Sequence, residues 1–303
     1  MTQGNFTGVL VPALTPFKAD LSPDRERYLA HLQWLLRQGA DGLAIFGTTS
    51  EANSMSVEEK IDLLDFVIEG GIAPSKLMPG TGCCALTDSV RLTAHAARRK
   101  CGGVLMLPPF YYKGVGDDGL FRNFSEVVQR VGDASLKVYL YHIPPQSATP
   151  ITLNLIAQLV KAYPKTVIGL KDSSGDWSNT AAVLKAFPDF DVFPGSELFL
   201  LQGLRAGGQG CITATGNINP AGIRKVYEGW QTPAADELQA GIDRVRKTLQ
   251  AYPMMPSLKR MIAYFHADPE WVHVRPPLVN LADEKWASLL AQLETIGFRV
   301  APR

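Results

Sequence analysis

Short apolar runs rich in β-branched residues alternate along the chain with longer segments in which apolar residues recur at helical spacing. The short runs are typical of strands that are buried on both faces. They cover residues 8–14, 42–46, 76–80, 103–107, 137–142, 166–170, 190–193 and 210–213. The helical segments cover residues 24–37, 57–69, 87–99, 119–130, 153–162, 177–187, 197–205 and 219–230. This alternation predicts βαβ units around a parallel sheet, and hence an α/β fold, a (β/α)8 TIM barrel.

Several predicted helices begin at residues that can cap a helix N-terminus. Ser56 precedes Glu59 by three positions, the spacing of a capping box, and Asp176 and Thr87 are further candidate caps. From residue 231 onward the sequence is helical in pattern but interrupted by prolines, and no Gly/Ser-rich linker precedes it. We therefore expect a barrel over residues 1–230 and a C-terminal helical extension over residues 231–303 that packs on the barrel.

The charge balance argues against a surface that binds nucleic acid. The 303 residues include 30 Lys and Arg against 29 Asp and Glu, a formal net charge of +1, so no nucleic-acid partner is expected. No apolar run approaches the length that crosses a bilayer, and residues 1–7 lack the basic start and apolar stretch of a signal peptide. We expect a cytoplasmic protein with no membrane partner.

Motifs for metals, nucleotides and serine hydrolysis are missing or incomplete. The four cysteines have no metal-ligand spacing and are expected to be free thiols, and the five histidines form no H-E-x-x-H pair. No G-x-S-x-G elbow occurs. Residues 80–85 match G-x-G-x-x-A after a predicted strand, but the acidic residue expected about twenty positions later is missing. We expect neither a metal nor a cofactor.

Candidate chemical groups fall at the ends of three predicted strands. Lys171 ends one apolar run and is followed by a polar turn, Tyr141 lies near the end of another, and the sequence Gly-Thr-Thr-Ser-Glu at residues 47–51 directly follows a third. In a parallel barrel these ends form the face on which active sites are built. Burial disfavours the charged form of an amine, and a free amine can form a Schiff base with a ketone. The alternative is a lysine whose ammonium group reaches solvent from the strand end.

These motifs occur in an order that resembles the pyruvate-dependent class I aldolases and lyases, the superfamily of dihydrodipicolinate synthase and N-acetylneuraminate lyase. The similarity covers nearly the whole chain. The resemblance implies a lyase that acts on pyruvate or another 2-keto acid through a Schiff base. It is carried by Thr15-Pro16-Phe17, Gly47-Thr48-Thr49 with Glu51, residues 108–112 (Pro-Pro-Phe-Tyr-Tyr), Tyr141 with Ile143-Pro144, Gly169-Leu170-Lys171-Asp172, and residues 274–278 (Val-Arg-Pro-Pro-Leu).

The resemblance also implies roles for the residues at the strand ends. Lys171 would be the nucleophile that forms the imine, and Tyr141 would be the proton shuttle beside it. Gly47, Thr48 and Thr49 would form a turn whose hydroxyl and backbone N–H groups bind the carboxylate of the substrate. The alternatives are a core aromatic residue for the tyrosine and simple turn formers for the threonines.

Three further positions correspond to substrate contacts or to subunit contacts in this superfamily. Tyr112 matches a tyrosine that reaches into the site of a neighbouring subunit, so a homodimer or homotetramer is expected. Ile212 matches an apolar residue beside the methyl group of the substrate. Glu197 offers one carboxylate where sialic-acid lyases present two acidic residues to the polyol.

Departures from the family pattern narrow the expected substrate. Gln146 stands where genuine synthases have an arginine that binds the carboxylate of the aldehyde substrate, and a neutral amide cannot form that charge-assisted pair. His142 replaces a usual asparagine, and Ser50 replaces a usual glycine. We therefore expect an aldolase that acts on a 2-keto-3-deoxy sugar acid or a similar 2-keto acid. The alternatives are dihydrodipicolinate synthase, a 2-keto-3-deoxy acid dehydratase, and a non-catalytic paralogue that binds a keto acid.

Overall fold

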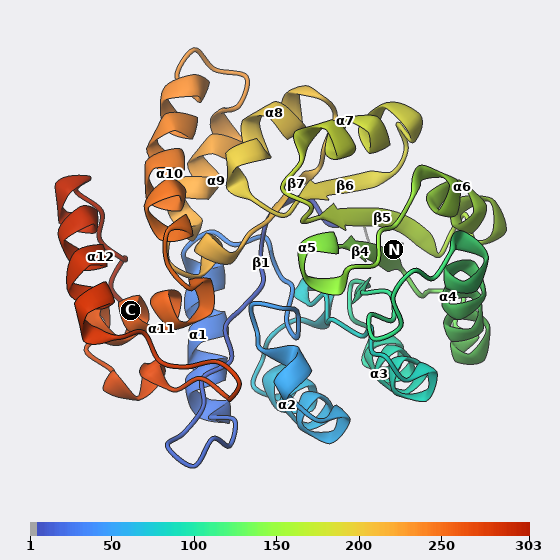
Figure 1. Ribbon diagram of the computed structural model, residues 1–303, viewed down its shortest axis with the longest axis horizontal. Coiled ribbons are helices and arrows are strands. Elements are labelled where there is room, and N and C mark those ends of the chain that lie inside the picture. Colours follow the sequence, from blue (N-terminus) through green and yellow to red (C-terminus); the bar gives the residue numbers. More distant parts are fainter. Residues whose placement is uncertain (1–4) are drawn as a thin grey trace.

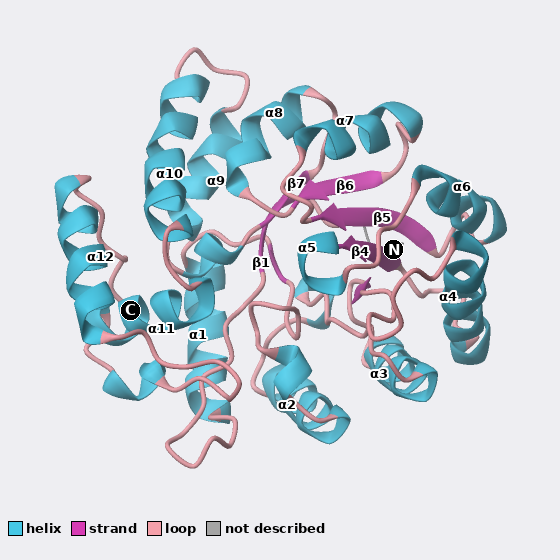
Figure 2. Cartoon of the chain, in the orientation of Figure 1, coloured by secondary structure: helices cyan, strands magenta, loops and turns pink. Residues whose placement is uncertain are grey.

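Parallel strands form the centre of the molecule, and helices surround them (Figures 1 and 2). The computed structural model describes residues 5–303, so part of the N-terminal stretch that bears on a signal peptide lies outside the described residues. Two groups of strands pair in parallel, in the orders β2-β1-β7 and β3-β4-β5-β6. The strands are β1 (Gly8–Val11), β2 (Gly42–Leu43), β3 (Val104–Met106), β4 (Val138–His142), β5 (Val167–Asp172), β6 (Asp191–Pro194) and β7 (Gly210–Ile212).

The two groups join into a closed barrel through single hydrogen-bonded segments. Between β6 and β7, the N–H of Gln209 donates to the carbonyl of Val192 at 3.1 Å. Between β2 and β3, an extended segment takes the place of the third predicted strand: Met78 donates to the carbonyl of Leu43, and Leu105 of β3 donates to the carbonyl of Pro79, each at 2.9 Å. The fold class predicted from the sequence is therefore confirmed.

The prediction of a regular strand at residues 76–80 was wrong. Pro79 has no N–H group to contribute to a ladder, and the segment forms only isolated bridges to its neighbours. The glycines on either side of Thr81 have a packing role: a Cβ atom at Gly80 would lie 2.1 Å from the carbonyl oxygen of Phe46, and one at Gly82 would lie 2.2 Å from that of Leu107. Close backbone contact therefore accounts for these two glycines of the nucleotide-like motif.

The helices follow the predicted alternation closely. The capping box of Ser56 and Glu59 and the N-cap of Asp176 are confirmed. Thr87 was wrongly predicted as a cap, because the helix already begins at Leu86. The hydroxyl of Ser89, in the first turn of this helix, accepts the N–H of Cys83. The helices around the barrel are α1 (Arg25–Arg37), α2 (Val57–Glu69), α3 (Leu86–Arg98), α4 (Asp117–Val131), α5 (Pro144–Ser147), α6 (Leu153–Ala162), α7 (Trp177–Ala186), α8 (Leu200–Arg205) and α9 (Pro220–Gly229).

Three further helices follow the barrel, on the side of α1 and α9 in Figure 1: α10 (Ala235–Gln250), α11 (Met254–Phe265) and α12 (Asp283–Thr295). The segment between α11 and α12 is tied to the barrel by polar contacts, including a salt bridge between Arg275 and Glu59 of α2. We keep the division into a barrel at residues 1–230 and an extension at residues 231–303 as a proposal. Within residues 5–303, no helix combines the length and apolar character needed to cross a membrane.

Candidate active site

A cavity of about 340 Å³ opens at the carboxyl ends of the strands. Strands β4, β5 and β7 contribute lining residues, and so do the 47–51 loop and the helices α10 and α11. The volume lies within the range of sites for small ligands. Of the sequence-predicted residues, it brings together Thr48, Thr49, Tyr141, Gln146, Lys171 and Ile212.

Lys171 and Tyr141 lie side by side in this cavity. They are partners in the parallel register of β4 and β5, and each is only 4% exposed. The amine Nζ of Lys171 lies 3.3 Å from the phenol oxygen of Tyr141 and 4.3 Å from the centre of its ring. The sequence-based alternative, in which the lysine reaches solvent, does not fit this burial. A buried amine beside a phenol is suited to nucleophilic attack with local proton transfer.

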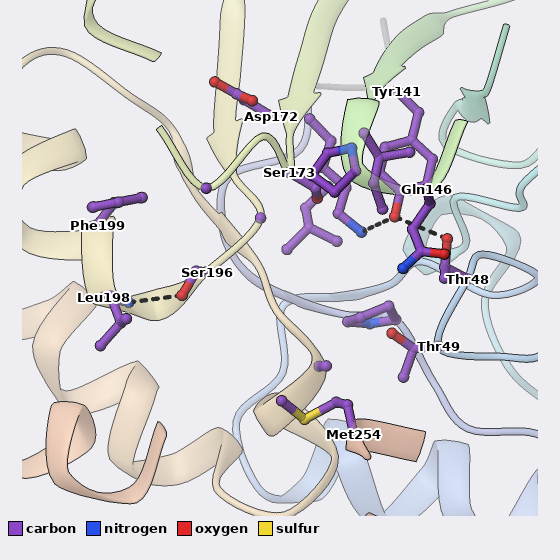
Figure 3. Close-up of a pocket in the computed structure, with 18 of the residues that line it drawn as sticks. Thr48, Thr49, Tyr141, Gln146, Asp172, Ser173, Ser196, Leu198, Phe199 and Met254 are labelled. Carbon is purple, nitrogen blue, oxygen red and sulfur yellow. Dashed lines mark hydrogen bonds between the residues drawn. The ribbon is translucent and has the colours of Figure 1, made fainter. Parts of the chain in front are cut away.

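The phenol oxygen of Tyr141 also contacts Thr48, whose hydroxyl lies 3.2 Å away (Figure 3). The phenol thus joins a hydroxyl of the 47–51 loop to an amine near the end of β5. A proton can pass between neighbours at hydrogen-bond distance. The three groups are thus linked by hydrogen-bond contacts in the cavity.

The 47–51 loop is held in place by Ser50. This buried hydroxyl donates to the carbonyl of Ala13 at 2.6 Å and accepts the N–H of Gly47 at 3.3 Å. Within residues 5–303, the N–H groups of Thr48 and Thr49 donate no hydrogen bond. Fixed and unused donors of this kind can bind a carboxylate with little reorganisation.

A buried ion pair connects this loop to the C-terminal extension. The carboxylate of Glu51 accepts from the amine of Lys259 and, at 2.8 Å, from the N–H of Arg275. Both charged side chains of the pair are fully buried. Burial lowers the pKa of Lys259 to about 8, although the carboxylate of Glu51 acts in the opposite direction. Sequence patterns do not reveal that Lys259 and Glu51 meet, because 208 residues separate them.

Gln146 lies on α5, directly after β4, and its exposed side chain lines the cavity (Figure 3). The segment that carries it is anchored by His142, whose Nδ1 accepts the N–H of Ile151 at 2.9 Å. Burial lowers the pKa of His142, and the hydrogen bond requires an unprotonated Nδ1. The unusual histidine at this position therefore orders the segment around Gln146.

Asp172 follows Lys171 in sequence but is used structurally. Its carboxylate accepts hydrogen bonds from Ser174, Asn179 and Thr180, at 2.9, 2.9 and 2.7 Å. Figure 3 shows its side chain pointing away from Tyr141. Asp172 therefore orders the turn that follows β5.

Glu197 lies outside the cavity lining, in the turn after β6. Its buried carboxylate accepts the hydroxyls of Thr213 and Thr215 and lies 3.7 Å from a guanidinium nitrogen of Arg246. Arg246 does line the cavity, and it was missed in the sequence analysis. The sequence signal that could have identified Arg246 is its charge, because it lies on the apolar stripe of α10, next to Val245 and four residues after Ile242.

Tyr112 lies on the loop between β3 and α4, away from the cavity of its own chain. It is 75% exposed and packs edge-to-face on Tyr111, which is 74% exposed, with 5.4 Å between ring centres. Two adjacent exposed aromatic rings are unusual on a surface that contacts only water.

The cysteines and other metal-binding residue types are dispersed. The thiols of Cys83, Cys84, Cys101 and Cys211 are all free. Among residues 5–303, no three His, Cys, Asp or Glu side chains are grouped so that they could hold a metal ion. The polar side chains that line the cavity carry an amine, a phenol, hydroxyls, amides, a guanidinium and the carboxylate of Asp172.

Comparison with known proteins gives consistent matches over nearly the full length. The sequence pattern of the dihydrodipicolinate synthetase family matches residues 5–296. An uncharacterized DapA-like lyase of Chloroflexus aurantiacus is 33% identical over 97% of this chain and 98% of its own. A dihydrodipicolinate synthase structure from Agrobacterium tumefaciens is 30% identical with a TM-score of 0.90, over 97% of this chain and 100% of that one. A variant of the Sulfolobus solfataricus 2-keto-3-deoxygluconate aldolase is 25% identical with a TM-score of 0.85, over 95% and 96%.

Proposed function

The chain belongs to the dihydrodipicolinate synthetase family and is a Schiff-base-forming, pyruvate-dependent lyase of that family, and from this premise we propose that Lys171 forms the imine with pyruvate or a longer 2-keto acid. The observation that carries the assignment is the contact of 3.3 Å between the buried amine of Lys171 and the phenol of Tyr141. Among the described residues that line the cavity, Lys171 supplies the only amine and Tyr141 the only phenol.

In the proposed reaction, the free amine of Lys171 attacks C2 of the keto acid, and the resulting carbinolamine loses water to give an iminium ion. The phenol of Tyr141 supplies and removes the protons of these steps, with the hydroxyl of Thr48 as its neighbour. The C1 carboxylate would accept the unused N–H groups of Thr48 and Thr49. Ile212, which is buried in the cavity wall, would contact C3 of the substrate.

The iminium ion is an electron sink, and it determines which bonds can break. It stabilises the carbanion left when the C3–C4 bond of a 2-keto-3-deoxy acid breaks, which releases an aldehyde and leaves the pyruvate enamine on Lys171. Protonation and hydrolysis of the enamine then release pyruvate. The neutral amide of Gln146 in the cavity wall supports an aldolase for a 2-keto-3-deoxy sugar acid or a similar acid, in preference to dihydrodipicolinate synthase.

A panel of 2-keto-3-deoxy acids, assayed separately for pyruvate release and for water loss, tests this proposal. Pyruvate release that disappears in Lys171→Ala is the expected result. Water loss without pyruvate release would instead identify a dehydratase that uses the same imine. Efficient condensation of aspartate semialdehyde with pyruvate by the unmodified protein would overturn the substrate assignment and identify a synthase.

We further propose that the protein works as a homodimer or homotetramer in which Tyr112 reaches the site of a neighbouring subunit. The exposure of Tyr111 and Tyr112 supports an interface at this loop. Tyr112→Phe should lower turnover while the protein keeps its mass in solution, as measured by analytical ultracentrifugation. A monomeric wild-type protein with full activity would contradict the proposal.

We propose the cytoplasm as the compartment of the protein, where free thiols such as the exposed Cys84 persist.

A further inference from the structure

Arg246 brings a positive charge to the catalytic cavity from outside the barrel. It lies on α10 of the C-terminal extension and lines the same cavity as Lys171. Its side chain is 14% exposed. Among the described lining residues, Arg246 and Lys171 are the basic ones. Because Lys171 is committed to the imine, Arg246 is the cation that is left for another part of the substrate.

The guanidinium group of Arg246 has donors without acceptors. Its Nε and Nη1 atoms are buried, and within residues 5–303 neither donates a hydrogen bond. The nearest carboxylate oxygen, on Glu197, is 3.7 Å from Nη1, which is beyond hydrogen-bond length. That carboxylate already accepts the hydroxyls of Thr213 and Thr215. Buried N–H groups that lack a partner are costly, so a small rotation of the partly exposed side chain that brings them to a ligand with acceptor oxygens would be favourable.

The placement of Arg246 is fixed by its helix. Two turns before it on α10, Gln239 donates to the carbonyl of Glu197 at 2.8 Å and accepts the N–H of Leu201 at 3.1 Å. These contacts clamp α10 against the turn after β6. The helix that carries Arg246 therefore forms a preorganised wall, which is the condition for a specific polar contact with a ligand.

From this geometry we propose that Arg246 binds a carboxylate at the end of the substrate remote from the keto group. The proposal rests on the proposed function: with C1 at Thr48 and Thr49 and C2 at Lys171, the rest of the substrate would extend toward the other lining residues, among them Ser196, Leu198 and Arg246. Arg246 would then supply, from a different element, the positive charge that Gln146 lacks. The substrate class becomes a 2-keto-3-deoxy acid that ends in a second carboxylate.

A carboxylate fits this position better than a phosphate. The planar fork of a guanidinium group matches the two oxygens of a carboxylate. Glu197 lies close to the guanidinium group and offsets part of its charge, so the remaining positive charge balances a carboxylate better than a phosphate dianion.

Borohydride trapping with two 2-keto acids of equal length tests the proposal without knowledge of the natural substrate. The probes are 2-oxoadipate, which ends in a carboxylate, and 2-oxohexanoate, which ends in a methyl group. The concentration that gives half-maximal trapping at Lys171 should be lower for 2-oxoadipate. In Arg246→Gln it should rise about ten- to a hundredfold for 2-oxoadipate, the range of a charge-assisted hydrogen bond, and less than about threefold for 2-oxohexanoate. Arg246→Lys should fall between.

Controls separate the possible failures. Arg244→Gln alters an exposed arginine on the same helix and should leave both concentrations unchanged, and normal trapping of pyruvate by Arg246→Gln shows that the variant is folded. Absence of a preference for 2-oxoadipate in the wild type, or a preference that survives in Arg246→Gln, overturns the role of Arg246. A stronger preference for an acid that ends in a phosphate overturns the choice of carboxylate. Failure of the wild type to trap pyruvate at Lys171 overturns the proposed function itself.

Discussion

Removal of the amine of Lys259 should destabilise the protein strongly, because this amine is half of the buried ion pair that holds the 47–51 loop. It donates to Glu51 and, at 2.7 Å, to the carbonyl of His273. It also lies 4.4 Å from the ring centre of Phe17. Lys259→Met keeps most of the side-chain volume but leaves the carboxylate of Glu51 buried, with the N–H of Arg275 as its remaining donor. The loss of one partner from a buried pair costs about 3–5 kcal/mol.

Urea unfolding followed by circular dichroism, at one fixed protein concentration, measures this cost. Arg260→Gln is the matched control on α11, since its partner Asp283 is 89% exposed and an exposed pair contributes less than about 1 kcal/mol. The double variant Lys259→Met with Glu51→Gln should recover part of the loss, because no unpaired charge remains buried. A Lys259→Met cost as small as that of Arg260→Gln would refute the reasoning. The single variant should also need more pyruvate for half-maximal trapping, because Thr48 and Thr49 lie on the loop that loosens.

Three further results are expected. Tyr141→Phe should reduce turnover about a hundredfold or more while the melting temperature stays close to that of the wild type, since a general acid-base group contributes that much; an unchanged rate would assign the proton transfers to another group. Burial lowers the pKa of His31 from 6.5 to about 3, so the unfolded chain binds a proton that the folded chain does not, and stability present above pH 6.5 is lost as the pH falls. Between pH 6 and pH 4, the unfolding free energy should fall with decreasing pH in both proteins, and the slope of the wild type should exceed that of His31→Gln by about 1.4 kcal/mol per pH unit. Equal slopes would contradict this. Dialysis against a chelator should leave turnover unchanged, and activity restored by added zinc or magnesium would contradict the lysine mechanism.

The pairing of Lys171 with Tyr141 could be predicted because strand ends in a parallel barrel meet on one face, and both residues end apolar runs. The observed register places them as direct neighbours. The role of Ser50 could not be predicted in the same way, because its hydrogen bond to Ala13 depends on how the loop folds over the end of β1. The pattern around Pro79 predicted an extended segment correctly, but a proline removes the hydrogen bond that a regular ladder needs.

The helical extension could be predicted from the sequence, but its contacts with the barrel could not. The period of residues 235–250 predicts a helix, but the element against which its apolar face packs depends on the tertiary fold. Arg246 and Lys259 reach the site from more than seventy positions away from Lys171, so local patterns do not reveal that they meet it. A charged residue on an apolar helical stripe is the one signal that would have marked Arg246.

Trapping of pyruvate on the unmodified protein tests the central claim most directly. The protein is incubated with pyruvate and borohydride, digested, and mapped by mass spectrometry, with Lys171→Ala treated in parallel. We predict that the reduced adduct is found on the peptide that contains Lys171 and is absent from the variant. An adduct on a different lysine, or no adduct in the presence of folded protein, would contradict the assignment of Lys171 as the imine-forming residue.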